Sequence, residues 1–303
     1  MNQTTKSSDD SSEKSTVILT AEYFAHPPPV RVDLAGLSHV GKVRPNNEDQ
    51  FLFARMRKSL EVLASTQPYE GDAALPDREG YFMMVADGMG GRAGGERASA
   101  MVVEAAKKHL LQTAKWFFSL DDPDEGVRLR MLREALEGLD RQLIEEAQRD
   151  PSLCGMGTTL TAASSVGPDV FIVHVGDSRA YLFHDGLLEQ LTTDHTLTQS
   201  YVELGILKPE EARKHRLRHV LTNAIGGKLG VVGEVQKLRV SNGDRMLLCT
   251  DGLTEGVTDS HIAEMLTRYS DPRAACQALV DAALEKGGND NITVVVATYA
   301  MTE

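Results

Sequence analysis

The stretch TTLTAASSVGPDVFIVHVGDSRAYLF, residues 158–183, contains three short apolar and β-branched runs in direct succession. The runs cover residues 158–165, 170–175 and 179–183, and each has the length and composition of a β-strand. Only short turns containing Gly, Pro or Asp separate them, with no segment of helical spacing in between. Strands that follow one another in this way favour antiparallel sheets over a doubly wound parallel sheet.

The remaining elements extend this pattern in both directions. Strand-like runs also occupy residues 81–86, 245–250 and 292–299. Apolar side chains repeat at helical spacing within residues 98–106, 129–143 and 274–282, and these stripes predict helices that pack on a core. The sequence therefore predicts an α+β layered sandwich with antiparallel sheets.

Composition excludes several classes of protein. The chain has 303 residues, and its 44 acidic and 32 basic side chains give a formal net charge of −12. A nucleic-acid binder or a protein held on anionic lipid normally carries a basic surface, so we expect neither partner. No run approaches the roughly 18 apolar residues that span a membrane. Three cysteines without metal-type spacing indicate a reducing compartment, and we expect a cytoplasmic monomer.

Two stretches lack the signals of regular structure. Residues 1–30 are polar and end in three consecutive prolines, which predicts a disordered N-terminal tail. Residues 57–79 contain a loose segment with Pro and Gly but no sustained periodicity. We expect plain linkers in both places, with partner contacts as the alternative.

Aspartates stand at four strand ends. Asp87 follows FMMVA, Asp177 follows IVHVG and Asp251 follows RMLLCT, while Asp290 lies in the turn GGNDN before the last strand. A single Asp-Gly pair is a common turn, so four unrelated surface turns are the alternative. Four such ends can instead converge, and converging carboxylates repel one another unless a cation lies between them.

The donor types indicate which cation. No His or Cys accompanies the aspartates at ligand-like spacing, and an all-oxygen set suits Mg²⁺ or Mn²⁺ rather than zinc or copper. Gly88 would let its backbone carbonyl approach the ion closely. Upstream, Arg44 has the planar fork that binds phosphate, and Glu48 and Asp49 could order water on the metal. A surface ion pair between Arg44 and Glu48 is the alternative for that arginine.

Eight motifs together resemble the metal-dependent serine/threonine protein phosphatases of the type-2C class, in their compact bacterial form. The resemblance runs from about Leu37 to Tyr299. In chain order the motifs are GLSHVGKVRPNNEDQF, VADGMGGRAGGERAS, GTTLTAA, VHVGDSRAYLF, LTTDHTL, HVLTNAIGG, LLCTDGLTEGV and DNITVVV. It implies a four-layer αββα sandwich with a metal cleft at one edge of two antiparallel sheets. It also implies one phosphatase domain over residues 31–303, with a flap at about residues 195–218.

The resemblance further implies roles for individual residues. Two Mn²⁺ or Mg²⁺ ions would be held by Asp87, Asp251, Asp290 and the Gly88 carbonyl, and Asp177 would serve a third, weaker ion. Arg44 matches the arginine that grips the substrate phosphate, and Glu48 and Asp49 match the acidic pair near the metals. The implied activity is hydrolysis of phosphoserine and phosphothreonine in proteins by metal-activated water, opposing a cognate serine/threonine kinase.

Some positions depart from the family, and two other functions stay open. Met89 stands where many eukaryotic members have a histidine that protonates the leaving group; a metal-bound water and His39 are the remaining candidates. Asn223 replaces a frequent arginine, and we expect His195 to be structural. The alternative functions are a hydrolase of small phosphate esters and a catalytically silent binding module.

Overall fold

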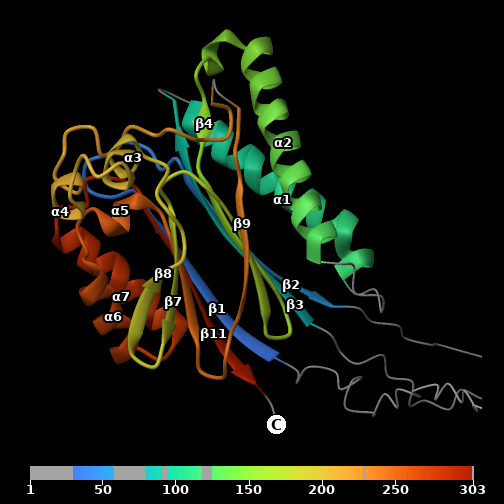
Figure 1. The fold of residues 1–303 in the computed structure, drawn as a ribbon, viewed down its shortest axis with the longest axis vertical. Coiled ribbons are helices and arrows are strands. Elements are labelled where there is room, and N and C mark those ends of the chain that lie inside the picture. Colours follow the sequence, from blue (N-terminus) through green and yellow to red (C-terminus); the bar gives the residue numbers. More distant parts are fainter. Residues whose placement is uncertain (1–29, 58–78, 91–93, 118–124, 228–229, 302–303) are drawn as a thin grey trace, which may run out of the picture.

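The structure is a computed structural model that describes residues 30–57, 79–90, 94–117, 125–227 and 230–301. The predicted tail, residues 1–30, and the predicted loose segment, residues 57–79, lie almost entirely outside these ranges. The described parts form two antiparallel sheets stacked face to face, with helices on both outer faces (Figure 1). The predicted four-layer αββα sandwich is confirmed.

The first sheet has five strands and the second has six. The order of the first is β1 (Val30–His39), β11 (Ile292–Met301), β10 (Arg245–Cys249), β7 (Arg179–His184) and β8 (Leu187–Gln190). The order of the second is β2 (Asp49–Arg57), β3 (Glu79–Met89), β5 (Leu160–Val166), β6 (Asp169–Val175) and β9 (Glu234–Arg239), with β4 (Gly157–Thr158) paired to the end of β3.

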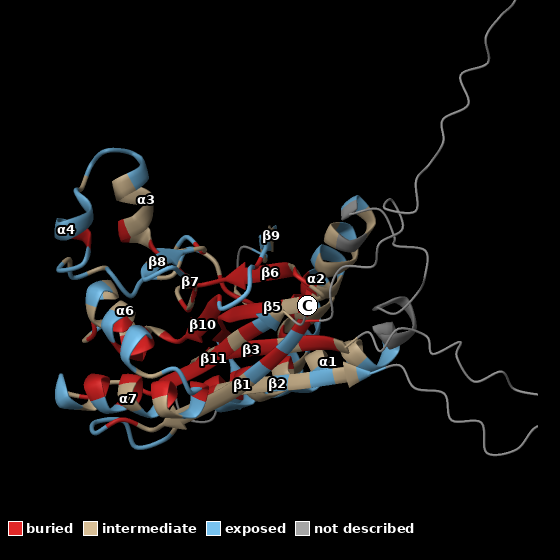
Figure 2. Cartoon of the chain, turned by 90° about the horizontal axis from the view of Figure 1, so that it is seen from below, coloured by how far each residue is buried: buried red, intermediate tan, exposed pale blue. Residues whose placement is uncertain are grey.

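Helices cover the outer faces. On the second sheet lie α1 (Gly94–Phe117) and α2 (Glu125–Arg149), and the short helix η2 (Pro151–Leu153) follows α2. On the first sheet lie α5 (Asp251–Thr254), α6 (Asp259–Arg268) and α7 (Pro272–Glu285). Figure 2 shows buried strands between these helix layers, and α3 (Leu197–Glu203) and α4 (Pro209–Ala212) project from one edge. Among the described helices, none is long and apolar enough to cross a membrane.

The core has three apolar layers because buried strands carry apolar residues on both faces. In β10, Met246 and Leu248 point between the two sheets, while Leu247 and Cys249 point toward α6 and α7. This alternation follows from the two-residue period of a strand. The third layer joins the second sheet to α1 and α2 through residues such as Met84. Burial on both faces explains why these strands appear as continuous apolar runs in the sequence.

Some element boundaries differ from the prediction. Asp87 does not follow its strand but lies within β3, which continues to Met89 because Gly88 and Met89 pair with β4. The single predicted strand over residues 158–165 is divided into β4 and β5 at Thr159, whose side chain serves the functional site instead of a ladder. The strands β1, β2, β8 and β9 and the helix α6 were not predicted.

The sandwich has two distinct ends. In the β1–β11 ladder Val30 lies opposite Met301 at one end, and His39 lies opposite Ile292 at the other. The end marked by His39 and Ile292 also holds the start of β2 and the ends of β6 and β10. The acidic residues singled out in the sequence therefore all belong to this end.

Candidate metal centre

A cavity of about 910 Å³ opens at this end of the sandwich, between the ends of the two sheets. Most of the predicted site residues line it: Arg44, Glu48, Asp87, Gly88, Asp177, Asp251 and Asp290. Asp49 does not line it but lies directly behind Asp87, in the next strand. The four aspartates are therefore not unrelated surface turns, and the fold brings them to one cleft.

Asp87 is held by the strand on each side of it. It lies opposite Asp49 in the β2–β3 ladder. Its backbone N–H donates to Thr159 Oγ1 at 2.9 Å, and its carbonyl accepts from Thr158 Oγ1 at 2.8 Å. These bonds fix the backbone of Asp87 independently of any side-chain partner.

Gly88 lies where no side chain would fit. A Cβ at this position would be 2.1 Å from the carbonyl oxygen of Gly95 and 2.8 Å from that of Glu48. The start of α1 thus packs directly on the backbone of β3. Glu48 also contacts the start of α1. Its carboxylate lies against Gly95, and its backbone carbonyl accepts a hydrogen bond from Ser99 Oγ at 2.6 Å.

Asp251 is the first residue of α5, and the residues around it connect the two sheets. Thr250 Oγ1 donates to Asp49 Oδ2 at 2.8 Å and accepts from the Thr293 N–H at 3.0 Å. Gly252 allows α5 to begin against β11, since a Cβ there would be 1.9 Å from the Asn291 carbonyl oxygen.

Asp290 and the loop that carries Arg44 are organised by Asn291. The buried Asn291 side chain donates to the carbonyls of Val40 and Asn46, both at 2.9 Å, and accepts from the Glu48 N–H at 2.8 Å. Arg44 Nη2 lies 2.6 Å from Asp290 Oδ2. The ion pair of Arg44 is therefore with a predicted metal ligand and not with Glu48.

The electrostatics of the cleft are dominated by several carboxylates that lie close together, most of them buried. Burial raises the pKa of Asp49 to about 7, with repulsion from Asp251 and Asp290 acting in the same direction. Burial also raises the pKa of Asp87 and that of Asp177 well above the usual range, and repulsion from Asp251 adds to both. These shifts arise because several carboxylates share a site with little solvent.

Unpaired oxygens provide a test of whether a cation fits. Among the described residues, Asp49 Oδ1 and Asp251 Oδ1 are buried and have no hydrogen-bond partner. Buried carboxylate oxygens normally have partners, and a cation is the partner that would also relieve the repulsion. The donors are all oxygens, which hard divalent ions such as Mn²⁺ and Mg²⁺ prefer. The residues present fit the implied metal pair.

Three residues that line the cleft were not predicted from the sequence: Arg218, His219 and Glu255. His219 Nε2 lies 2.9 Å from Glu255 Oε1 and its Nδ1 lies 3.6 Å from Asp251 Oδ2, while Arg218 lies 3.8 Å from Glu255. The nearby Asp251 carboxylate is the main reason why the pKa of His219 is raised, and Glu255 acts in the same direction. Glu255 follows Asp251 by four residues in α5 and its C-cap, which is a helical spacing that could have identified it.

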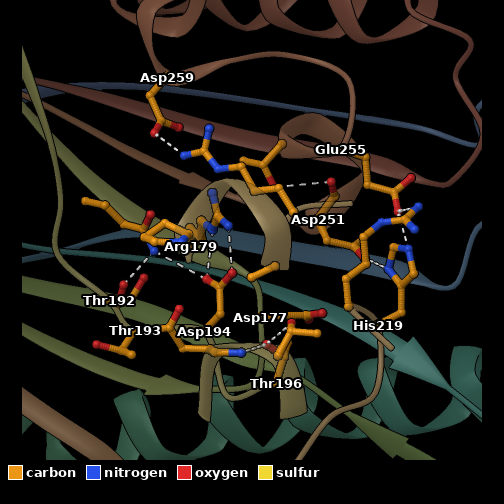
Figure 3. Close-up of a pocket in the computed structure, with 18 of the residues that line it drawn as sticks. Asp177, Arg179, Thr192, Thr193, Asp194, Thr196, His219, Asp251, Glu255 and Asp259 are labelled. Atoms are coloured by element: carbon orange, nitrogen blue, oxygen red, sulfur yellow. Dashed lines mark hydrogen bonds and ion pairs between the residues drawn. The ribbon is translucent and has the colours of Figure 1, made fainter. Parts of the chain in front are cut away.

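A second cavity, of about 410 Å³, adjoins the first beneath residues 195–218. The two cavities share Asp177, His219 and Asp251, among others. In Figure 3, Arg179 and Asp194 are hydrogen-bonded to each other in the lining of this second cavity, and Asp259, which also lines it, accepts from Arg213. The predicted flap thus overlies a polar cavity that continues from the metal cleft.

The other histidines and Asn223 lie outside the cleft. His39 Nδ1 accepts from the Gly41 N–H at 2.9 Å, which is a local turn contact. Asn223 bonds to both backbone groups of Val232 and lies 3.1 Å from His195 Nδ1, so it fixes a loop. Met89 lines the cleft, as its position in the sequence indicated.

Comparisons with known proteins agree with this geometry. Residues 71–286 match the family model described as Protein phosphatase 2C. The serine/threonine protein phosphatase PstP of Mycobacterium tuberculosis is 40% identical over 216 residues, which are 71% of this chain and 40% of that protein. The serine/threonine phosphatase stp of Listeria monocytogenes is 33% identical over 224 residues, 73% of this chain and 86% of that protein.

A solved structure of the mycobacterial relative also resembles this chain. The catalytic domain of PstP in complex with two manganese ions superposes with a TM-score of 0.69 at 35% identity, covering 89% of this chain and 99% of that one. The chain thus spans about two fifths of the full mycobacterial relative but nearly all of its catalytic domain.

Proposed function

The chain belongs to the protein phosphatase 2C family, and on that premise we propose that it hydrolyses phosphoserine and phosphothreonine in proteins with the help of divalent metal ions. The observation that carries the proposal is the convergence of Asp87, Asp251 and Asp290 with Arg44 on one cleft. Family relatives named serine/threonine phosphatases support the substrate class, and the manganese-bound relative supports the metal.

In this proposal the carboxylates of Asp87, Asp251 and Asp290 and the Gly88 carbonyl hold two Mn²⁺ or Mg²⁺ ions, and Asp177 serves a third. When bound, such ions lower the pKa of a coordinated water and offset charge on the phosphoryl oxygens. Asp49 is buried behind Asp87 and receives a hydrogen bond from Thr250, so it keeps the ligand strands in place. Glu48 lies at the rim of the cleft, where it can order water.

Arg44 binds the substrate phosphate in this proposal. Its side chain is 54% exposed and lines the cleft, and it is paired with Asp290. A guanidinium can bind two phosphoryl oxygens at once, so it positions the phosphorus as well as adding positive charge. Asn291 supports this role because it fixes the loop that carries Arg44 to the turn that carries Asp290.

The extent of the domain, its cellular location, its oligomeric state and the opposing kinase are also proposed. Residues 31–303 form one phosphatase domain that acts as a cytoplasmic monomer and opposes a serine/threonine kinase. All three cysteines are free, which agrees with a reducing compartment. Size-exclusion chromatography with light scattering measures the oligomeric state, and a dimer would contradict that part.

The test compares the wild-type chain with Asp251→Asn, with and without Mn²⁺, on a phosphothreonine peptide and on free phospho-metabolites. Asp281→Asn is the matched control, because Asp281 is exposed on α7 and its carboxylate contacts Gln277. We expect Mn²⁺-dependent hydrolysis, higher kcat/KM on the peptide, and loss of turnover only in Asp251→Asn. Higher kcat/KM on metabolites would indicate a small-ester hydrolase. Calorimetric Mn²⁺ binding without turnover on either substrate would indicate a silent module.

A further inference from the structure

The predicted flap, residues 195–218, has little buried side-chain surface of its own. Among its residues only Thr196, Thr198 and Ala212 are buried, and Leu204 and Ile206 at its tip are 72% and 62% exposed. Figure 2 shows its helices α3 and α4 standing away from the sandwich. A segment with so few buried contacts depends on its base for a defined position.

The base of the flap is bonded to the turn that carries Asp177. The His195 N–H donates to the Gly176 carbonyl at 2.7 Å, and the Gly176 N–H donates to His195 Nδ1 at 3.1 Å. One residue of the flap thus satisfies both backbone groups of the residue that precedes Asp177. Gly176 has a φ of 108°, and a Cβ there would be 2.5 Å from Thr159 Cγ2, so the turn is confined on its other side as well.

The contacts of the His195 ring define its tautomer. Asn223 Nδ2 lies 3.1 Å from Nδ1, so two donors point at this nitrogen, which is therefore unprotonated. The proton is on Nε2, which donates to Glu234 Oε1 at 3.1 Å. The ring is 14% exposed, and its centroid lies 4.8 Å from that of the buried His174. Each polar atom of the ring thus has an assigned partner.

Both ends of the flap meet at the same residue. The His195 carbonyl accepts from the Thr222 N–H at 2.9 Å, just after the flap ends, and Leu197 N–H donates to the Val220 carbonyl at 2.8 Å. Beside this junction, Arg179 binds Asp194 through two bonds of 2.8 and 2.6 Å (Figure 3). The turn after β6 and the two ends of the flap therefore form one hydrogen-bonded junction, with His195 at its centre.

We propose that His195 is a positioning residue that joins the flap to the Asp177 turn, so that the flap and the Asp177 carboxylate shift together. The consequence rests on the proposed function: a cation bound at Asp177 would hold the flap, and a held flap would favour that cation equally. Nothing in this role requires the imidazole to touch substrate or metal.

Hydrogen–deuterium exchange of the full chain in EDTA tests the junction without metal. His195→Asn keeps an acceptor near the place of Nδ1, and His195→Gln keeps only a group near Nε2. His195→Ala keeps neither, and His261→Ala is a control on α6, where the ring contacts Glu264. We expect exchange about tenfold faster in His195→Ala and His195→Gln, both in residues 174–180 and in 196–204. This corresponds to the loss of one to two neutral hydrogen bonds. His195→Asn and His261→Ala should match the wild type.

Acceleration in only one of the two regions, or equal behaviour of the Asn and Gln variants, would overturn the proposal. A second arm avoids substitution of His195. Mn²⁺ should slow exchange of residues 196–204 in the wild type and have no such effect in Asp177→Asn. Slowing in both proteins would count against the coupling. Calorimetry and peptide hydrolysis on the same samples separate the proposed phosphatase function from the proposed role of His195. A wild type that neither binds Mn²⁺ nor hydrolyses the peptide would refute the function alone, because the exchange experiment in EDTA tests His195 without metal.

Discussion

Asp49 and Asp87 lie directly opposite each other in the β2–β3 ladder, at the strand ends nearest the cleft. Two carboxylates in register across an antiparallel pair repel each other, and burial of Asp49 strengthens the effect. The metal-free protein therefore stores unfavourable electrostatic energy at the point where the two sheets meet the site.

The first prediction concerns pH. The pKa of Asp49 is about 7 in the folded chain and lower when unfolded, so folding takes up protons between these values. The stabilising effect of protonation is complete below the unfolded pKa and is lost as the pH rises through about 7. In EDTA, Tm should therefore fall from pH 5 to pH 8. Asp49→Asn should flatten this dependence of Tm on pH. A Tm that rises from pH 5 to pH 8 in the wild type would contradict the raised pKa of Asp49.

The second prediction concerns Asn291. Asn291→Ala removes three hydrogen bonds to part-buried backbone groups, and each such bond contributes about 0.5–1.5 kcal/mol. We expect Tm to fall by several degrees and kcat/KM to fall because the loop that carries Arg44 loses its anchor. The control is Asn242→Ala, since the Asn242 side chain accepts the Met301 N–H at the opposite end of the sandwich. Equal losses in both variants would argue against a specific anchoring role.

The third prediction concerns the phosphate grip. Arg44→Lys keeps the charge but removes the planar fork, and a charge-assisted hydrogen bond contributes about 1.5–3 kcal/mol. We expect kcat/KM to fall by about 10- to 100-fold and the inhibition constant of inorganic phosphate to rise in parallel. Arg31→Lys is the matched control because Arg31 is exposed and paired with Asp33. An unchanged phosphate inhibition constant would assign Arg44 to structure alone.

The fourth prediction compares two glycines. Gly88→Ala places a methyl group 2.1 Å from the Gly95 carbonyl oxygen, so the start of α1 must move away from β3. We expect lower Tm and weaker Mn²⁺ binding by calorimetry. Gly138→Ala, inside α2, meets only the tip of Arg141 at 3.9 Å and should raise stability by about 0.5–1 kcal/mol. A change of Tm in the same direction in both variants would contradict the close packing of α1 on Gly88.

The buried centre of this fold could be predicted from the sequence, whereas its edges could not. β10 and β11 are buried on both faces, so their composition alone identifies them. The edge strands β8 and β9 are short, and none of their residues is fully buried, so neither has the continuous apolar run by which the central strands were identified. β2 was missed because it begins inside the NNED segment, where its first residues look like a polar turn.

The residues of the site also divide into those that the sequence could predict and those that it could not. Aspartates beside glycine at strand ends could be identified because a buried strand fixes where it ends. His219 and Asn291 could not, since their importance comes from partners 32 to 251 positions away, such as Asp251 and Val40. The pairing of Arg44 with Asp290 was missed for that reason as well, being a contact between residues 246 positions apart.

The pairing of Val30 with Met301 has a consequence for chain connectivity. The first and last strands leave the sandwich side by side, at the end opposite the cleft. A few added residues could join residue 301 to residue 30, and new termini could be opened in the exposed Asp185–Gly186 hairpin, which lies at the same end. Such a circular permutant would keep every ligand-bearing turn intact. Catalysis in this architecture should therefore depend on which strands are neighbours and not on the order in which the chain visits them.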